Sequence, residues 1–166
     1  SGYVQRFNSA GAAQGKAISL GSINTYNREA AVGMDAVGNF VVSWEGSDSV
    51  RRFSAAGALL GTISLPSANK MLVDMNPSGE FAVVYSQDGT SDAVARLYEA
   101  NGALATTISL PSAIEQGNGA IEAVALSDAG DLALGYRNWF RRYDPVTGLQ
   151  VGSDFDLGVR VYDPAG

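Results

Sequence analysis

The feature that most constrains the fold of this chain is an internal repeat. Residues 57–68, GALLGTISLPSA, return as residues 102–113, GALATTISLPSA, with ten of twelve positions identical at a shift of 45 residues. A fixed period of this length is typical of arrays in which neighbouring repeats bury a shared core. We therefore expect one repeat domain over residues 1–166, with repeats at 12–57, 58–102 and 103–148 and partial repeats at 1–11 and 149–166.

Two further blocks recur in each repeat. A central block of hydrophobic, turn, glycine, polar and hydrophobic residues occupies 34–40, 75–81 and 126–132. Its glycines suit the positive φ angles of a short hairpin loop, and they are Gly38, Gly79 and Gly130. Side chains that can bond their own turn backbone come before them, and we expect Asp35, Asn76 and Asp128 in that role. A closing block begins in successive copies with Arg6, Arg52, Arg96 or Arg142 and ends in glycine.

Apolar residues alternate with a period of two after each central turn. The bulky positions are Phe40, Val42 and Trp44, then Phe81, Val83 and Tyr85, then Leu132, Leu134 and Tyr136. The residues between them are small but still apolar, whereas a strand at the surface would carry charges on its outer face. The pattern therefore predicts sheets covered on both sides, with large residues of one sheet packed on small residues of the next.

Each repeat is expected to supply four short strands, which in the first repeat lie near residues 16–20, 30–35, 39–45 and 50–54. Four antiparallel strands per 40 to 50 residues is the plan of a β-propeller blade. The fold class is therefore all-β and propeller-like, with about three four-stranded blades and partial flanking strands. A β-sandwich or a β-solenoid built from the same hairpins is the structural alternative.

The motif Met34-Asp-x-x-Gly-Asn-Phe-Val-Val-x-Trp44, followed by a closing strand with Arg, an aromatic residue and Gly, resembles the tandem propeller-type repeats of large bacterial extracellular and surface proteins. The resemblance implies an extracellular or cell-surface location and no particular ligand. Closed propellers usually have four or more blades. We therefore expect a longer array, closure by the chain's own two ends, or a homo-oligomer in which one chain completes the blade begun by residues 3–7 of another.

Composition narrows the function classes. The net charge of −6 argues against nucleic acid as a partner, because phosphates are bound by clustered Lys and Arg. The chain has no Cys and no His, so disulfides, thiolate nucleophiles and the usual zinc ligands are absent, and we expect no metal and no cofactor. No apolar stretch is long enough to suggest membrane insertion. Because Ser1 is not preceded by Met, we expect a piece of a longer protein.

Candidate binding residues lie at strand ends and loops. The aromatic residues Trp44, Tyr85 and Tyr136 could stack on a sugar, or they could pack between blades. Trp139 with Asn138 could be an exposed anchor for a glycan or protein ligand, or Trp139 could pack against the neighbouring chain. The acids expected at a rim are Asp48, Asp88 and Asp92. Other loop contributors are expected in 24–29, 87–92 and 115–118.

Arg6, Arg52, Arg96 and Arg142 could bind an anionic group, and the alternative is that each pairs with a neighbouring Asp or Glu. The turn residues Asp35, Asp128 and Asp131, with Asn39 and Asn76, could suggest calcium, but the dense Asp-x-Asp-x-Asp run of a calcium loop is missing.

The expected function is therefore a non-enzymatic binding module, with no catalytic residue, serving adhesion or ligand binding through loops at one face. An oligomerising scaffold is the first alternative. A glycan-active hydrolase is the second, and it would need two carboxylates facing one cleft.

Overall fold

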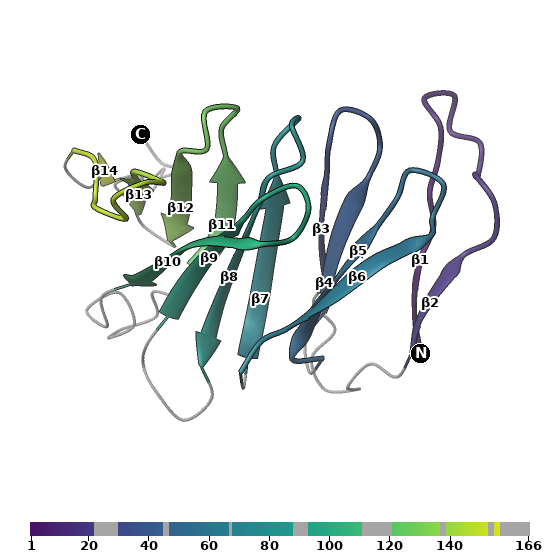
Figure 1. Ribbon diagram of the computed structural model, residues 1–166, viewed down its shortest axis with the longest axis horizontal. Helices are drawn as coiled ribbons and strands as arrows, with labels where there is room; N and C mark the ends of the chain where they lie inside the picture. The colour runs from purple at the N-terminus through teal and green to yellow at the C-terminus, as the bar shows by residue number, and fades with distance from the viewer. Residues whose placement is uncertain are drawn as a thin grey trace, which may run out of the picture.

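The computed structural model describes residues 1–21, 30–44, 47–66, 68–87, 93–110, 121–136, 139–152 and 155–156. The described residues form β-strands and turns with no helix, and the strands make four antiparallel sheets. Figure 1 shows the sheets side by side in chain order, from the purple N-terminal pair of strands to the yellow-green C-terminal sheet. The all-β prediction is therefore confirmed.

The first sheet contains two strands and each of the others contains four. Sheet one pairs β1 (Gly2–Val4) with β2 (Ile18–Gly21). Sheet two contains β3 (Ala30–Met34), β4 (Phe40–Trp44), β5 (Ser49–Phe53) and β6 (Leu59–Ser64). Sheet three contains β7 (Ala68–Met75), β8 (Phe81–Gln87), β9 (Ala93–Tyr98) and β10 (Leu104–Leu110). Sheet four contains β11 (Ile121–Leu126), β12 (Leu132–Tyr136), β13 (Trp139–Tyr143) and β14 (Phe155–Asp156).

Sheet boundaries and repeat boundaries differ by one strand. The strand expected near residues 16–20 exists as β2, but it pairs with β1 and not with the strands that follow it. In the same way β6 closes the sheet of β3 to β5, although it lies in the second sequence repeat. The four strands expected in one repeat therefore belong to two sheets. Because each sheet has the up-and-down order of a propeller blade, we call sheets two, three and four blades one, two and three.

The alternation of bulky and small residues is confirmed as the packing rule between blades. Phe81, Val83 and Tyr85 of blade two pack in one core cluster with Val41 and Val50 of blade one. On its other face, Ala82 and Val84 of blade two pack with Leu132 and Leu134 of blade three. Each blade therefore turns its bulky face toward the preceding blade and its small face toward the next. Successive sheets packed in this way match propeller blades and not the two facing sheets of a sandwich.

The central turns share one hydrogen-bond pattern. Gly38, Gly79 and Gly130 all have positive φ, as expected for a residue without a side chain. The Oδ1 atoms of Asp35 and Asn76 accept hydrogen bonds from the amides four residues later. In the third turn the expected Asp128 is wrong, because Ser127 occupies this position and its Oγ accepts the bond from the Asp131 amide at 3.0 Å. A Ser hydroxyl makes the same local bond as a carboxylate, so the two residue types exchange here.

The innermost strands β3, β7 and β11 lie close together and use different contacts. Gly33 on β3 leaves room for the backbone of β7, since a Cβ placed there would lie 2.7 Å from the Met75 nitrogen. Between β7 and β11, the Asp74 carboxylate accepts a hydrogen bond from the Leu126 amide at 2.8 Å. Adjacent blades are thus fixed at the centre either by direct backbone approach or by a side-chain bridge.

Candidate functional site

Two of the aromatic residues expected to stack on a sugar are core residues. Trp44 is 3% exposed and Tyr85 is 1% exposed. The Arg51 guanidinium lies 4.8 Å from the Trp44 ring centroid, and that of Arg96 lies 5.7 Å from the Tyr85 ring centroid. Sugar stacking by Trp44 and Tyr85 is therefore wrong for this structure, and the alternative of packing between blades holds.

Asp48 has a conformational role in the structure. It has a φ of 45°, the one positive φ outside glycine among the described residues. Its Oδ1 accepts a hydrogen bond from the Ala68 amide at 2.9 Å, and its carbonyl accepts one from the Leu65 amide at 2.8 Å. Asp48 therefore ties the β4–β5 connection to the start of blade two.

The remaining predicted site residues lie partly or wholly beyond what the structure describes. Asn138, Asp88 and Asp92 are outside the described residues, as are most of the expected binding loops. Tyr136 and Trp139 belong to β12 and β13, and their side chains lie outside the described part of the structure. The antiparallel topology does place the C-terminal ends of β2, β4, β8, β10 and β12 at one face, opposite the tight central turns (Figure 1).

Replacing Tyr85 with phenylalanine tests the structural role of this residue. Its hydroxyl is buried without a hydrogen-bond partner among the described groups, so we expect Tyr85→Phe to change the free energy of unfolding at pH 7 by less than about 1 kcal/mol. Burial raises the pKa of Tyr85, and the Arg96 charge offsets part of this. Above about pH 10 the unfolded tyrosine ionises first, so the native protein loses stability as pH rises. Urea unfolding from pH 8 to 11 should show a smaller loss for Tyr85→Phe, and equal losses would contradict the assignment.

Two of the closing-block arginines, Arg6 and Arg52, connect consecutive sheets. Arg6 donates a hydrogen bond to the Ala55 carbonyl, in the β5–β6 turn of the next sheet. Arg52 donates to the carbonyls of Ala100 and Asn101, in the β9–β10 turn of the next blade, the latter at 2.5 Å. The expected pairing with a carboxylate is therefore wrong for Arg6 and Arg52. These residues bind backbone oxygens one blade further along.

The strand register corrects the equivalence of the arginines. Phe53 pairs with Phe40, Tyr98 with Phe81 and Tyr143 with Leu132, so Phe53, Tyr98 and Tyr143 share one position. Arg52 and Arg142 directly precede that position, and in blade two the residue there is Leu97. Arg96 corresponds instead to Arg51 and Arg141. The arginine that joins blade one to blade two therefore has no counterpart between blades two and three.

A groove lies at this point in both interblade contacts, beside the central and closing turns. The first groove, between blades one and two, has a volume of about 250 Å³ and contains the Arg52 side chain. The second, between blades two and three, has a volume of about 470 Å³ and contains Leu97. Ala105 lines the second groove where Leu60 lines the first. Smaller side chains at equivalent positions therefore open the second groove.

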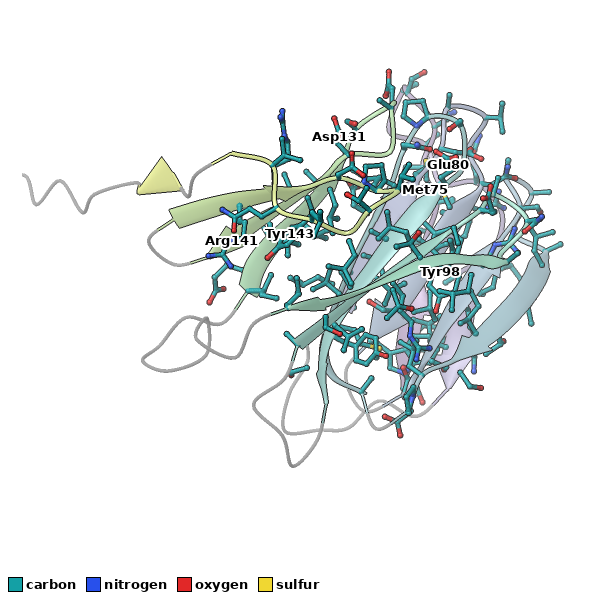
Figure 2. All side chains as sticks on the ribbon, turned by 60° about the vertical axis from the view of Figure 1, so that its left-hand side comes forward. Met75, Glu80, Tyr98, Asp131, Arg141 and Tyr143 are labelled. Carbon is teal, nitrogen blue, oxygen red and sulfur yellow. The ribbon has the colours of Figure 1, made fainter. Side chains whose placement is uncertain are left out.

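The two grooves also differ in charge. The first is lined by one carboxylate, Asp35, and one guanidinium, Arg52. Among the described residues, the second is lined by the carboxylates of Glu80 and Glu99 and by no basic side chain. Glu80 is positioned by a 2.7 Å hydrogen bond from the Asn76 amide, and Figure 2 shows it near the same end of the molecule as Asp131. The second groove is thus both wider and anionic.

The outer wall of the second groove is the β13 closing turn. Asp144 accepts hydrogen bonds from the amides of Val146 and Thr147 at 3.0 and 2.7 Å. Hydrogen bonds from the Thr147 backbone and side chain lower the pKa of Asp144 below its ordinary value. The turn is therefore held by an ionised carboxylate at neutral pH, and it presents Pro145 and Val146 to the groove.

Sequence reasoning missed this site, because its signal is a leucine where the other copies have arginine.

Among the described residues, no group of three or more acidic side chains is arranged to hold a metal ion. The described part of the chain also contains no helix long and apolar enough to cross a membrane.

Comparison with known proteins supports the fold. No protein-family model and no curated protein matches the chain. A protein of unknown function from Bacteroides caccae is similar in structure, with a TM-score of 0.60 and 15% identity over 80% of this chain and 47% of its own. Virginiamycin B lyase from Staphylococcus aureus has a TM-score of 0.55 and 14% identity over 81% of this chain and 43% of its own. Hsv2 from Kluyveromyces lactis has a TM-score of 0.53 and 9% identity over 76% of this chain and 36% of its own.

These neighbours are β-propeller proteins of varied or unknown function, and the likeness at such low identity shows the fold alone. The chain spans less than half the length of each of these three structures. The fold is therefore that of a β-propeller, represented by three blades and a two-stranded sheet that do not close into a ring.

Proposed function

We propose that this chain is a non-enzymatic binding segment of a secreted or cell-surface bacterial β-propeller protein, and that it binds its ligand in the groove between blades two and three. The observation that carries the proposal is the difference between two equivalent grooves, of about 250 and 470 Å³. The volume of the wider groove falls within the range of small-molecule and peptide side-chain sites. The secreted location rests on the resemblance of the repeats to those of bacterial surface proteins, and adhesion is the role that such a location suggests.

The lining of the second groove supports binding better than catalysis. Its walls combine the apolar side chains of Leu97, Leu126, Pro145 and Val146 with the polar side chains of Glu80, Glu99 and Thr106. Glycoside hydrolysis needs one carboxylate as acid and a second as nucleophile or base. Glu80 is already bound through Oε2 by the Asn76 amide, which suits a structural carboxylate.

Screening the chain on glycan and peptide arrays tests the proposal, if a variant with a narrower second groove is screened on the same arrays. Ala105→Leu restores the side chain of the first groove, so we expect it to abolish binding of any groove ligand. Ala103→Leu is the matched control, because it adds the same group to an exposed residue that does not line the groove. A ligand recovered from the bound protein should be chemically unchanged, because the proposed function is binding without catalysis. Absence of any ligand, or equal binding by both variants, would overturn the proposal.

An uncovered apolar face favours a second candidate function, an oligomerising scaffold. Val32 and Met34 on β3 are 59% and 54% exposed, whereas the equivalent Val73 and Met75 are 6% and 8% exposed because blade one covers them. Phe7, beside β1, is 62% exposed. Two further strands added to sheet one would cover this face. Light scattering after size exclusion tests whether a second copy supplies them. Oligomers lost in Met34→Ser would support the scaffold, and a monomer at all concentrations would exclude it.

A further inference from the structure

We infer that the second groove binds the guanidinium group of an arginine side chain supplied by a protein partner. The inference rests on the proposed function, since it requires that the groove binds a ligand, and it adds the chemical class of that ligand. The same interblade position carries different side chains in successive blades, Arg52 in blade one and Leu97 in blade two.

Two copies of this position within the chain already hold a guanidinium group. Arg6 fills it between sheet one and blade one, where it donates to the Ala55 and Gln14 carbonyls. Arg52 fills it between blades one and two, where it donates to the adjacent carbonyls of Ala100 and Asn101. A guanidinium suits such neighbouring oxygens because its N–H donors form a rigid planar fork. The interblade position is therefore shaped around this group.

The same contact site remains in the second groove without its internal arginine. Leu97 takes the place of Arg52 and has no hydrogen-bond donor on its side chain. Pro145 and Val146 stand where Ala100 and Asn101 stand, and both line the groove. The closing turn of blade three is one residue longer, since the Asp144 carbonyl accepts from the Gly148 amide four residues on at 2.9 Å, whereas the Glu99 carbonyl accepts from the Gly102 amide three residues on at 2.8 Å. Pro145 and Val146 still directly follow Asp144, as Ala100 and Asn101 directly follow Glu99. The carbonyls of Pro145 and Val146 are thus the expected acceptors.

The charge of the groove selects the same ligand. Glu80 and Glu99 replace the neutral Asn39 and Ser54 of the first interblade contact. An incoming cation would therefore meet two carboxylates. In the first groove the Phe81 ring lies 5.9 Å from the Arg52 guanidinium, and in blade three the equivalent residue is Leu132. The second groove therefore lacks this aromatic contact, and the two carboxylates would stabilise a bound cation instead. The first groove is lined by one carboxylate and one guanidinium, whereas the described lining of the second contains two carboxylates and no basic side chain, which indicates a cation from outside the chain.

Titrating the ¹⁵N-labelled chain with blocked tripeptides tests the inference. The probes are Gly-Arg-Gly, Gly-Lys-Gly and a Gly-citrulline-Gly analogue, in which citrulline keeps the shape of arginine without its charge. We expect the arginine peptide to shift the amides of Glu99, Val146 and Thr147 and to bind about tenfold more tightly than the citrulline peptide. The lysine peptide should be intermediate, because an ammonium group lacks the planar fork.

Leu97→Arg supplies the decisive variant. The new side chain should occupy the groove as Arg52 occupies the first, so affinity for the arginine peptide should fall at least about tenfold and the thermal midpoint should rise. Leu97→Met is the neutral control of similar volume, and it should keep binding within about twofold. If Leu97→Arg does not fold, Glu99→Gln serves instead, with an expected loss of about threefold.

The outcomes separate the inference from the function on which it rests. Equal affinity for arginine and citrulline peptides would overturn the guanidinium ligand and leave a groove that binds by shape. Arginine binding that Leu97→Arg and Glu99→Gln both leave unchanged would place the site elsewhere and overturn the inference. No binding of any tripeptide would overturn it as well, while a ligand from the arrays that is sensitive to Ala105→Leu would keep the proposed function.

Discussion

Replacing Phe81 with alanine is expected to lower the free energy of unfolding by about 4 kcal/mol, because deletion of a fully buried aromatic side chain loses its burial and leaves a cavity. Phe81 is 0% exposed, and its ring stacks on Tyr98 with centroids 4.9 Å apart. It lies in the cluster that joins blades one and two, so nearby side chains on both blades lose contacts. Urea unfolding followed by fluorescence and circular dichroism measures the change.

Leu104→Ala is the matched control for this substitution. Leu104 begins the outer strand β10 of the same blade and is 51% exposed, so we expect a loss below about 1 kcal/mol. The comparison separates the loss of a packed interblade contact from the loss of an apolar side chain as such. Similar losses for Phe81→Ala and Leu104→Ala would show that the contact between blades one and two contributes little to stability.

The second large effect is expected at Gly33, where valine should cost about 3 kcal/mol because an added side chain would overpack a closely packed interior. The Cβ of any residue there would lie 2.7 Å from the Met75 nitrogen and 3.0 Å from the Asp74 carbonyl carbon. Both neighbours are backbone atoms of β7, so they can move only if the two blades separate. Intrinsic strand propensity acts in the opposite direction, but its whole range is about 1 kcal/mol, so the steric effect dominates.

Gly61→Val separates these two effects. Gly61 lies on β6, where a Cβ would meet nothing within 4 Å, and the equivalent residue in the next repeat is Thr106. Valine is therefore expected to leave stability unchanged or to raise it slightly at this position. Urea midpoints of the two variants provide the measurement. A Gly33→Val protein as stable as Gly61→Val would exclude close approach of β3 and β7.

The repeat and its alternation were sufficient to predict the blades. Large side chains such as Phe40 and Phe81 mark one face of a strand, and their period of two is the same in all three repeats although the residue types differ. Gly38, Gly79 and Gly130 were predictable because a positive φ leaves few other choices. The grouping of strands into sheets was not predictable, since a strand with two apolar faces carries no sign of which neighbour it pairs with.

The second groove could not be predicted from the sequence, for a related reason. The closing blocks were aligned on arginine, which placed Arg96 with Arg52, whereas hydrogen-bond register places Leu97 there. The block that begins at Arg96 starts one residue earlier on its strand than the block that begins at Arg52, and alignment on arginine hides this difference. The packing of Trp44 and Tyr85 between blades was one of two interpretations that the sequence left open, because a position at a strand end does not tell which side another blade covers.

The one-strand offset between repeats and sheets has a consequence for how such a chain can grow. An in-frame duplication of one 45-residue unit delivers an outer strand to the sheet before it and three inner strands to the sheet after it. Every new unit therefore contributes strands to two neighbouring sheets, and it cannot form a sheet of its own. Successive duplications therefore lengthen the array without interrupting a sheet. Shortening it without breaking a sheet requires cuts between sheets, such as between the end of β6 at Ser64 and the start of β7 at Ala68, and not at the borders of the sequence repeat.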